Sequence, residues 1–179
     1  VDVLKDGVHR ANLELYRRNR EVAHMMGTTL TSTMIVDTTA YIANIGDSRT
    51  YLYRSGKGLR QITRDHSVVA QMVESGLITR EEVYTHPKRN QIYRCLGEHA
   101  TVEVDTFVVQ LQPDDVLLLC SDGLWEMVHD RVLEKIVGTS AHSPAQLSTL
   151  LVQAALNYGG ADNISVVVVR VASAHQSYQ

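Results

Sequence analysis

Apolar residues recur at helical spacing at the start of the chain, and this pattern predicts an amphipathic helix. From Asp2 to about His24, apolar side chains return at steps of three, four or seven residues, while arginines occupy the other faces. Gly27 is expected to end the helix, because glycine readily adopts the backbone conformation found just past a helix end. The helix must bury its apolar stripe, so the strands that follow are its expected partner.

Four short segments rich in β-branched and aromatic residues come next, and they predict an antiparallel meander. The turn between the second and third segments contains Gly46, Asp47 and Ser48, which places the carboxylate of Asp47 at the end of a strand. The four predicted strands are residues 30–36, 40–45, 50–53 and 59–63.

The pattern changes over residues 64–97, which we interpret as a flap. Ser67 is placed to cap a short helix, and the spacing of Thr79 and Glu82 is that of a capping box for another. Residues 88–94 then mix basic and aromatic groups without a clean period, which is typical of a surface excursion.

The last third of the chain predicts two strands, two helices and a final strand. Ser143 and Pro144 are a strong helix start, with proline in the first helical position. Residues 164–171 are nearly all β-branched, which predicts a central strand buried on both faces. The other predicted elements are strands at residues 102–111 and 116–120 and a helix at residues 132–137.

The predicted elements mix helices with antiparallel strands, which indicates the α+β class. Length and composition indicate one domain. With 179 residues and 44% hydrophobic content, the chain has enough apolar material for a sizeable core. We expect a single domain over residues 1–171 and a tail over residues 172–179. A net charge of -3, without long charged blocks, gives no electrostatic reason to expect nucleic acid or an anionic membrane as partner.

Two cysteines and the hydropathy pattern indicate the cellular compartment in which we expect the protein. Cys95 and Cys120 lie far apart in apolar surroundings without a metal-ligand pattern, so we expect buried free thiols in a reducing, cytoplasmic setting. No apolar run approaches the roughly 18 residues that a membrane-spanning helix needs, so no membrane insertion is expected.

Three aspartates share one description, since each lies in a glycine-containing turn at the end of a predicted strand. They are Asp47, Asp122 and Asp162, and Gly123 lets the backbone turn sharply behind the second. If the strand ends coincide, the carboxylates converge, which is unfavourable unless a cation neutralises them or their pKa values rise. As hard oxygen ligands they favour Mg²⁺ or Mn²⁺. Carboxylate-bound metal pairs commonly support phosphoester hydrolysis. The alternative is three unrelated turns, because Asp-Gly is a common turn dipeptide.

Several motifs, in this order and spacing, resemble those of the metal-dependent serine/threonine protein phosphatases of type 2C, and of their bacterial members in particular. The resemblance covers about residues 3–171 and implies two stacked antiparallel β-sheets flanked by helices, with the metal centre at one rim. The motifs are Gly27-Thr28-Thr29, Ile45-Gly46-Asp47-Ser48-Arg49, Thr63-Arg64-Asp65-His66-Ser67, Ser121-Asp122-Gly123-Leu124-Trp125 and Gly160-Ala161-Asp162-Asn163-Ile164-Ser165-Val166.

The resemblance also implies roles for individual residues. Asp122 and Asp162 match ligands of one ion of a central Mn²⁺ or Mg²⁺ pair, and Asp47 matches a ligand of a weaker third ion, shared with Asp122. Asn163 is then expected to support the loop that aims Asp162, and Ser48 to hold its turn.

Two arginines and two histidines have more than one interpretation. Arg89 and Arg94 fall where the family has its flap beside the substrate entrance, and a plain surface loop is the alternative. For His66 and His86 we expect a structural role, as a cap or loop contact, rather than catalysis.

One part of the family pattern has no counterpart in this chain. The family begins with strands that carry a phosphate-binding arginine and an acidic residue, followed by Asp-Gly-x-Gly-Gly, whose first aspartate bridges both metals. Asp6-Gly7 lacks the following glycines and lies in a helical pattern, so the bridging role is not transferred to Asp6. Without those strands, we expect open sheet edges that favour self-association or completion by another chain.

The intact domain is therefore expected to hydrolyse phosphoserine and phosphothreonine in proteins, the targets of serine/threonine kinases, with a metal-activated water. The alternative is a pseudophosphatase or interaction module that keeps the fold without catalysis.

Overall fold

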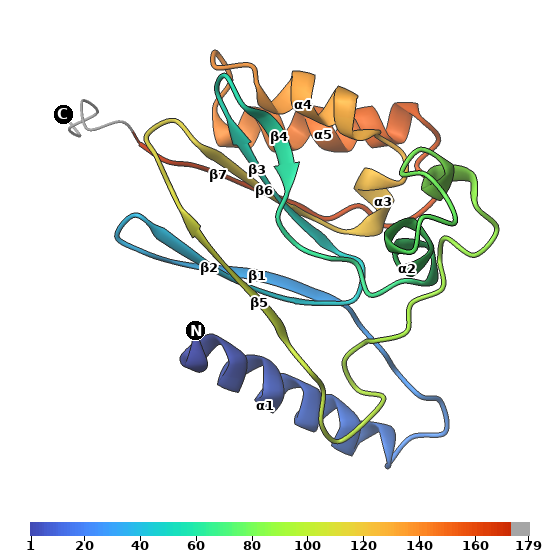
Figure 1. Cartoon of the computed structure of the whole chain (residues 1–179). Helices are drawn as coiled ribbons and strands as arrows, with labels where there is room; N and C mark the ends of the chain where they lie inside the picture. The colour runs from blue at the N-terminus through green and yellow to red at the C-terminus, as the bar shows by residue number, and fades with distance from the viewer. Residues whose placement is uncertain (173–179) are drawn as a thin grey trace. The chain divides into compact units, whose positions relative to one another are not determined.

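The computed structural model describes residues 1–172, which form helices and two β-sheets (Figure 1). Among these residues, no helix combines the length and hydropathy needed to cross a membrane. In chain order the elements are α1 (Asp2–Asn19), β1 (Leu30–Val36), β2 (Thr39–Ile45), β3 (Arg49–Arg54), β4 (Gly58–Gln61), α2 (Val68–Glu74), the 3₁₀ helix η1 (Glu82–Thr85), β5 (Asp105–Gln110), β6 (Val116–Cys120), α3 (Asp122–Trp125), α4 (Asp130–Val137), α5 (Pro144–Asn157) and β7 (Val166–Arg170).

The strands form a three-stranded sheet, in the order β1-β2-β5, and a four-stranded sheet, in the order β4-β3-β6-β7. Both sheets are antiparallel and have flanking helices, which confirms the predicted α+β class. The predicted meander of four consecutive strands is wrong, because β2 and β3 belong to different sheets. The chain changes sheet at Gly46, whose φ of 92° belongs to a region that side chains other than glycine rarely adopt.

The chain divides into two compact units. The first consists of Val1–Met34, Tyr41–Ser48 and Thr63–Phe107, and the second of Ile35–Ala40, Arg49–Ile62 and the described residues from Val108 onward. A single domain over residues 1–171 stays a prediction, and the predicted tail lies outside the described residues except for Ala172.

The first unit is built where α1 packs against strands β1 and β2. Val8 of the helix lies in one buried cluster with Ala43 and Ile45 of β2, and Leu4 and Leu15 pack against this cluster. Complete burial of one such large aliphatic side chain contributes about 1.5–3 kcal/mol. The apolar stripe of α1 thus finds the partner that its spacing predicts.

Helix α1 ends at Asn19, five residues before the predicted end. The Asn19 side chain donates to the carbonyl oxygens of Met26 (2.7 Å) and Gly97 (2.9 Å) and accepts from the Met26 amide (2.8 Å). These bonds turn the chain back on itself, and they leave Val22 and Met25 48% and 71% exposed. The helical spacing of those two residues was therefore misleading.

A buried asparagine joins α1 to the loop that precedes β5. Asn12 is 1% exposed, donates to the His99 carbonyl (2.9 Å) and accepts from the Gly97 amide (2.9 Å). Asn12 therefore lies on the buried face of the helix, where an apolar side chain would be expected. The apolar periodicity of the sequence did not indicate that this position is buried.

Asn12→Leu is expected to lower the free energy of unfolding by about 2–3 kcal/mol, because the buried Gly97 amide loses its acceptor. Urea unfolding followed by circular dichroism measures this change. Arg10→Ala, on the exposed face of the same helix, should change the value by less than about 0.5 kcal/mol. Equal effects of the two substitutions would contradict the role given to Asn12.

The second unit is organised around β6, which pairs with β3 on one side and β7 on the other. Helices α3, α4 and α5 cover one face of this sheet, with α3 against β6, α4 against β4 and α5 against β7 (Figure 1). Four of the five residues of β6 are buried.

Strand β7 corrects the prediction of a central strand buried on both faces. It pairs only with β6 among the described strands, and Val167 is 55% exposed. The other four residues of the strand are half-buried, and none is fully buried. The strand buried along nearly its whole length is β6, and Asp162 precedes an edge strand.

Both helix starts predicted within residues 64–97 are confirmed. The Ser67 hydroxyl accepts from the Ala70 amide (3.2 Å) at the start of α2. Thr79 and Glu82 form the reciprocal bonds of a capping box before η1, with the Thr79 amide 2.7 Å from Glu82 Oε2. Both cysteines are free, and Cys120 is buried whereas Cys95 is half-buried.

Candidate metal centre

The second unit brings Asp122 and Asp162 together. In the antiparallel pair of β6 and β7, Cys120 lies opposite Val166, so the chain leaves β6 beside the place where it enters β7. Asp122 lies two residues after Cys120, and Asp162 lies four residues before Val166. Burial raises the pKa of Asp122, and the negative charge of Asp162 raises it further. A hydrogen bond from the Gly123 amide (2.9 Å) lowers this pKa and so opposes both effects.

Ser121 ties the two chain corners to each other. Its hydroxyl donates to the Asn163 carbonyl (3.2 Å) and accepts from the Ser165 amide (3.0 Å), while its own amide donates to the Ser165 carbonyl (3.1 Å). Sequence reasoning did not assign Ser121 a role. Its position directly before a helix start is the signal that could have indicated one.

Gly123 is required by the close approach of the same two corners. A Cβ atom at this position would lie 2.3 Å from the Asn163 carbonyl oxygen, well inside van der Waals contact. The Asn163 amide in turn donates to Asp162 Oδ1 (2.6 Å). Asn163 therefore acts through its main chain, which orients the Asp162 carboxylate and receives the bond from Ser121.

The far end of α3 is held by an arginine from β3. The Arg49 guanidinium lies 3.5 Å from the ring centroid of Trp125, the last residue of the helix, and donates to the Tyr51 hydroxyl (2.9 Å). Tyr51 donates to Asp130 (3.1 Å), and burial raises the pKa of its phenol. A desolvated cation–π contact contributes about 2 kcal/mol, so Arg49 anchors the short helix that begins at Asp122.

Asp47, the third predicted ligand, belongs to the first unit. It lies at the end of β2 and is 6% exposed. Gly46 before it faces Thr29, and a Cβ atom on Gly46 would lie 2.3 Å from Thr29 Cγ2. Ser48 after it shares a hydrogen bond with the Thr29 hydroxyl (2.8 Å).

His66 lies against the same turn and is 1% exposed. Nδ1 of its ring accepts from the Gly46 amide (3.0 Å), and Nε2 lies 3.2 Å from Asp105 Oδ2. Burial lowers the pKa of His66 and the Arg94 charge adds to this, whereas the bond to Asp105 opposes it. Because Nδ1 accepts the Gly46 amide, the fold favours the neutral ring with its proton on Nε2.

The free energy of unfolding is expected to fall as the pH drops below about 6.5, the ordinary pKa of histidine. Below that value the unfolded state takes up a proton that the folded state resists, so the contribution of His66 is complete above pH 6.5. One proton gives a slope of at most about 1.4 kcal/mol per pH unit. Urea unfolding between pH 5.5 and 7.5 tests this, and the slope should flatten in His66→Asn but not in His24→Asn, at an exposed histidine.

Of the two flap arginines, Arg94 is engaged within the first unit. Its guanidinium donates to Asp105 (2.8 Å) and Glu103 (3.1 Å) and lies 3.1 Å from Nε2 of His66. These bonds hold the loop around His66. Arg89 lies in the turn after η1, where its amide donates to the His86 carbonyl (3.1 Å).

The donor chemistry of Asp122 and Asp162 fits a hard divalent cation. Two carboxylates with mutually unfavourable charges supply anionic oxygen, which Mg²⁺ and Mn²⁺ prefer. Within residues 1–172, no group of three or more histidine, cysteine or acidic side chains could hold a metal ion. The pair therefore accounts for part of a coordination shell only.

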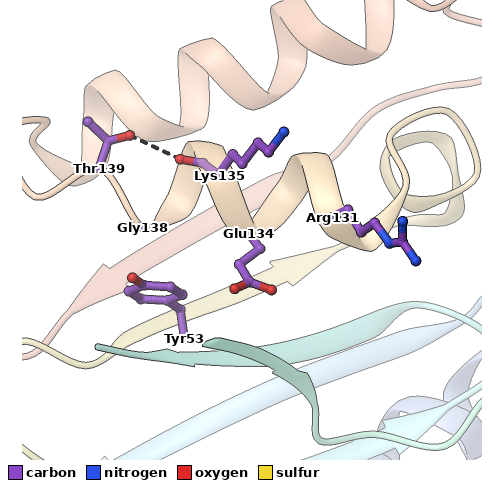
Figure 2. Close-up of a pocket in the computed structure, with 6 residues that line it drawn as sticks. All are labelled: Tyr53, Arg131, Glu134, Lys135, Gly138 and Thr139. Atoms are coloured by element: carbon purple, nitrogen blue, oxygen red, sulfur yellow. Dashed lines mark hydrogen bonds between the residues drawn. The ribbon is translucent and has the colours of Figure 1, made fainter. Parts of the chain in front are cut away.

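A separate cavity of 460 Å³ lies between β3 and α4 in the second unit (Figure 2). Tyr53 points toward Gly138 across it, and the Thr139 hydroxyl donates to the Lys135 carbonyl (3.0 Å). The remaining lining residues are Arg131 and Glu134. None of the predicted site residues lines this cavity, so it is distinct from the candidate metal centre.

Comparison with known sequences matches two family profiles to successive parts of the chain. The family described as "Protein phosphatase 2C" matches residues 1–72, and the family described as "Stage II sporulation protein E (SpoIIE)" matches residues 73–172. Together they cover the whole described part of the chain.

Individual relatives agree with these matches. A curated serine/threonine phosphatase from Listeria welshimeri is 43% identical over 155 residues, which make up 87% of this chain and 61% of the relative. The crystal structure of a serine/threonine phosphatase from Staphylococcus aureus has a TM-score of 0.90 at 34% identity, covering 96% of this chain and 68% of that one.

A second solved structure is the catalytic domain of the serine/threonine protein phosphatase PstP in complex with two manganese ions. It has a TM-score of 0.85 at 34% identity, and the match covers 95% of this chain and 70% of that one. The chain spans about three fifths to two thirds of the length of the curated Listeria relatives that it matches.

Proposed function

The chain belongs to the type 2C protein phosphatase family, and from this we propose that it supplies part of the active site of an enzyme that hydrolyses phosphoserine and phosphothreonine in proteins. The observation that carries the proposal is the pair of carboxylates, Asp122 and Asp162, at adjacent ends of β6 and β7. Relatives named as serine/threonine phosphatases support the reaction class.

Asp122 and Asp162 would hold one ion of a Mn²⁺ or Mg²⁺ pair, and Asp47 a weaker third ion. When bound, such ions lower the pKa of a water molecule and stabilise negative charge on phosphoryl oxygens. The manganese complex of PstP supports this choice of cofactor.

The residues of this chain then act by orientation. The Asn163 amide aims the Asp162 carboxylate, Ser121 holds the two corners together, and Gly123 permits their close approach. Burial of Asp122 limits competing hydration of its carboxylate, so an incoming cation meets a partly desolvated anion. Within residues 1–172, Asp122 and Asp162 would supply only part of the coordination shell of the metal pair.

Physiological substrates would be phosphorylated proteins, the products of serine/threonine kinases, in a cytoplasmic signalling setting. Arg89 and Arg94 lie in the segment proposed as the substrate flap. Arg94 would act there by holding the loop, because its guanidinium is engaged by Asp105 and Glu103.

Hydrolysis of p-nitrophenyl phosphate and of a phosphothreonine peptide, titrated with Mn²⁺ and Mg²⁺, tests the proposal. The natural gene product that contains residues 1–179 should be active with metal and inactive after chelation. Residues 1–179 alone should be far weaker, because Asp47, Asp122 and Asp162 do not complete a metal pair. A natural gene product that stays inactive with every divalent metal would favour an interaction module instead.

A further inference from the structure

His66 bonds to both main-chain polar groups of Gly46, the residue that precedes Asp47, one through its buried imidazole and the other through its own amide. The His66 amide donates to the Gly46 carbonyl (2.9 Å), and Nδ1 of the ring accepts from the Gly46 amide (3.0 Å). Both polar groups of Gly46 are therefore satisfied by one residue that lies 20 positions further along the chain.

Asp105 and Arg94 determine which ring nitrogen can accept. Nε2 lies 3.2 Å from Asp105 Oδ2, and Arg94 donates to the other oxygen of the same carboxylate at 2.8 Å. A carboxylate facing Nε2 keeps the proton on that nitrogen, which leaves the lone pair of Nδ1 for the Gly46 amide. Arg94 Nη1 also lies 3.1 Å from Nε2, so the bond from the Gly46 amide to Nδ1 is the contact that assigns the proton to Nε2.

The turn that carries Asp47 has a second anchor on its other side. Ser48 is bonded to the Thr29 hydroxyl (2.8 Å), and Thr29 also packs against the Cα of Gly46. Asp47 thus lies between two fixed residues, of which Gly46 has the unusual φ of 92°. Gly46 is flexible by nature, so its conformation depends on the partners that hold its amide and carbonyl.

We propose that His66 is a positioning residue for Asp47, acting through the bond from the Gly46 amide to Nδ1. Its role rests on the proposed function, in which Asp47 binds a metal ion. In this role His66 acts through Gly46 and is not itself a metal ligand. A histidine that only filled volume would tolerate any replacement of similar size, whereas a positioning histidine requires an acceptor at the place of Nδ1.

Two nearly isosteric substitutions separate these roles. His66→Asn keeps an oxygen acceptor where Nδ1 was and loses the bond to Asp105. His66→Gln keeps a polar group where Nε2 was and loses the acceptor for Gly46. Both should be made in the natural gene product that contains residues 1–179.

The first measurement is hydrogen exchange at the Gly46 amide without added metal. Exchange should stay slow in the wild type and in His66→Asn, and become at least about 10-fold faster in His66→Gln, as expected when a buried amide loses its acceptor. The second is the Mn²⁺ concentration for half-maximal hydrolysis. It should rise at least about 5-fold in His66→Gln and less than 2-fold in His66→Asn, with the KM for p-nitrophenyl phosphate unchanged in both.

The proposal is overturned if the two variants behave alike in either measurement. Should both variants fail to fold, the ¹⁵N resonance of Nδ1 in the wild type decides, because a protonated Nδ1 cannot accept from Gly46. If the wild type has no metal-dependent activity, the proposed function fails. Unchanged exchange at Gly46 in an active His66→Gln variant refutes the role of His66 alone.

Discussion

Asp122→Asn is expected to abolish Mn²⁺-dependent phosphatase activity while the protein stays folded. Loss of a carboxylate ligand removes several kcal/mol of transition-state stabilisation, which corresponds to at least about a 100-fold decrease in kcat. The same substitution should raise the midpoint of thermal unfolding in the absence of metal. Burial and the charge of Asp162 both disfavour the ionised carboxylate, and asparagine carries no charge.

Steady-state kinetics and thermal melts of one preparation measure both effects. Asp114→Asn is the matched control, because Asp114 is an exposed aspartate of the same unit at a turn position that asparagine also tolerates. It should leave kcat and the unfolding midpoint close to wild type. Full activity of Asp122→Asn would contradict the assignment of Asp122 as a metal ligand.

Gly123→Ala is expected to destabilise the second unit by about 2–4 kcal/mol, because its Cβ would lie 2.3 Å from the Asn163 carbonyl oxygen. Relief of this clash must separate the two corners that carry Asp122 and Asp162. The unfolding midpoint should therefore fall by about 5–15 °C, and the affinity for Mn²⁺ should fall with it. Differential scanning calorimetry and isothermal titration calorimetry measure the two changes.

Gly7→Ala is the control for Gly123→Ala and is expected to have the opposite effect on stability. Gly7 lies within α1, and a Cβ there would meet no atom within 4 Å. Alanine at this position should stabilise the helix by about 0.5–1 kcal/mol, since glycine loses more backbone entropy on folding. If Gly123→Ala were as harmless as Gly7→Ala, the close contact with Asn163 would not constrain the centre.

Helix starts were predictable because their signals lie within one turn of chain. Ser143 and Gln146 form the reciprocal bonds of a capping box before α5, and Thr79 and Glu82 do so before η1. The strand segments followed similarly from β-branched and aromatic composition.

The failures all involve partners that are distant in sequence. α1 stops at Asn19 because that side chain bonds to Gly97, and the buried position of Asn12 depends on the same loop. The edge position of β7 depends on which strands and helices surround it, and a run of valines contains no information about that.

The candidate site also combines features that local sequence predicts with features that depend on residues distant in sequence. The chain alone was enough to select three candidate metal ligands, Asp47, Asp122 and Asp162, because glycine-containing motifs indicate turns at strand ends. The metal preference was predicted separately, from the oxygen chemistry of carboxylates. The bonds from Ser121 to Asn163 and from Gly46 to His66, and the contact of Arg49 with the Trp125 ring, could not be predicted in this way. They join segments that approach only when the sheets form, so tertiary packing decides how each carboxylate is held, while local sequence decides which residues carry one.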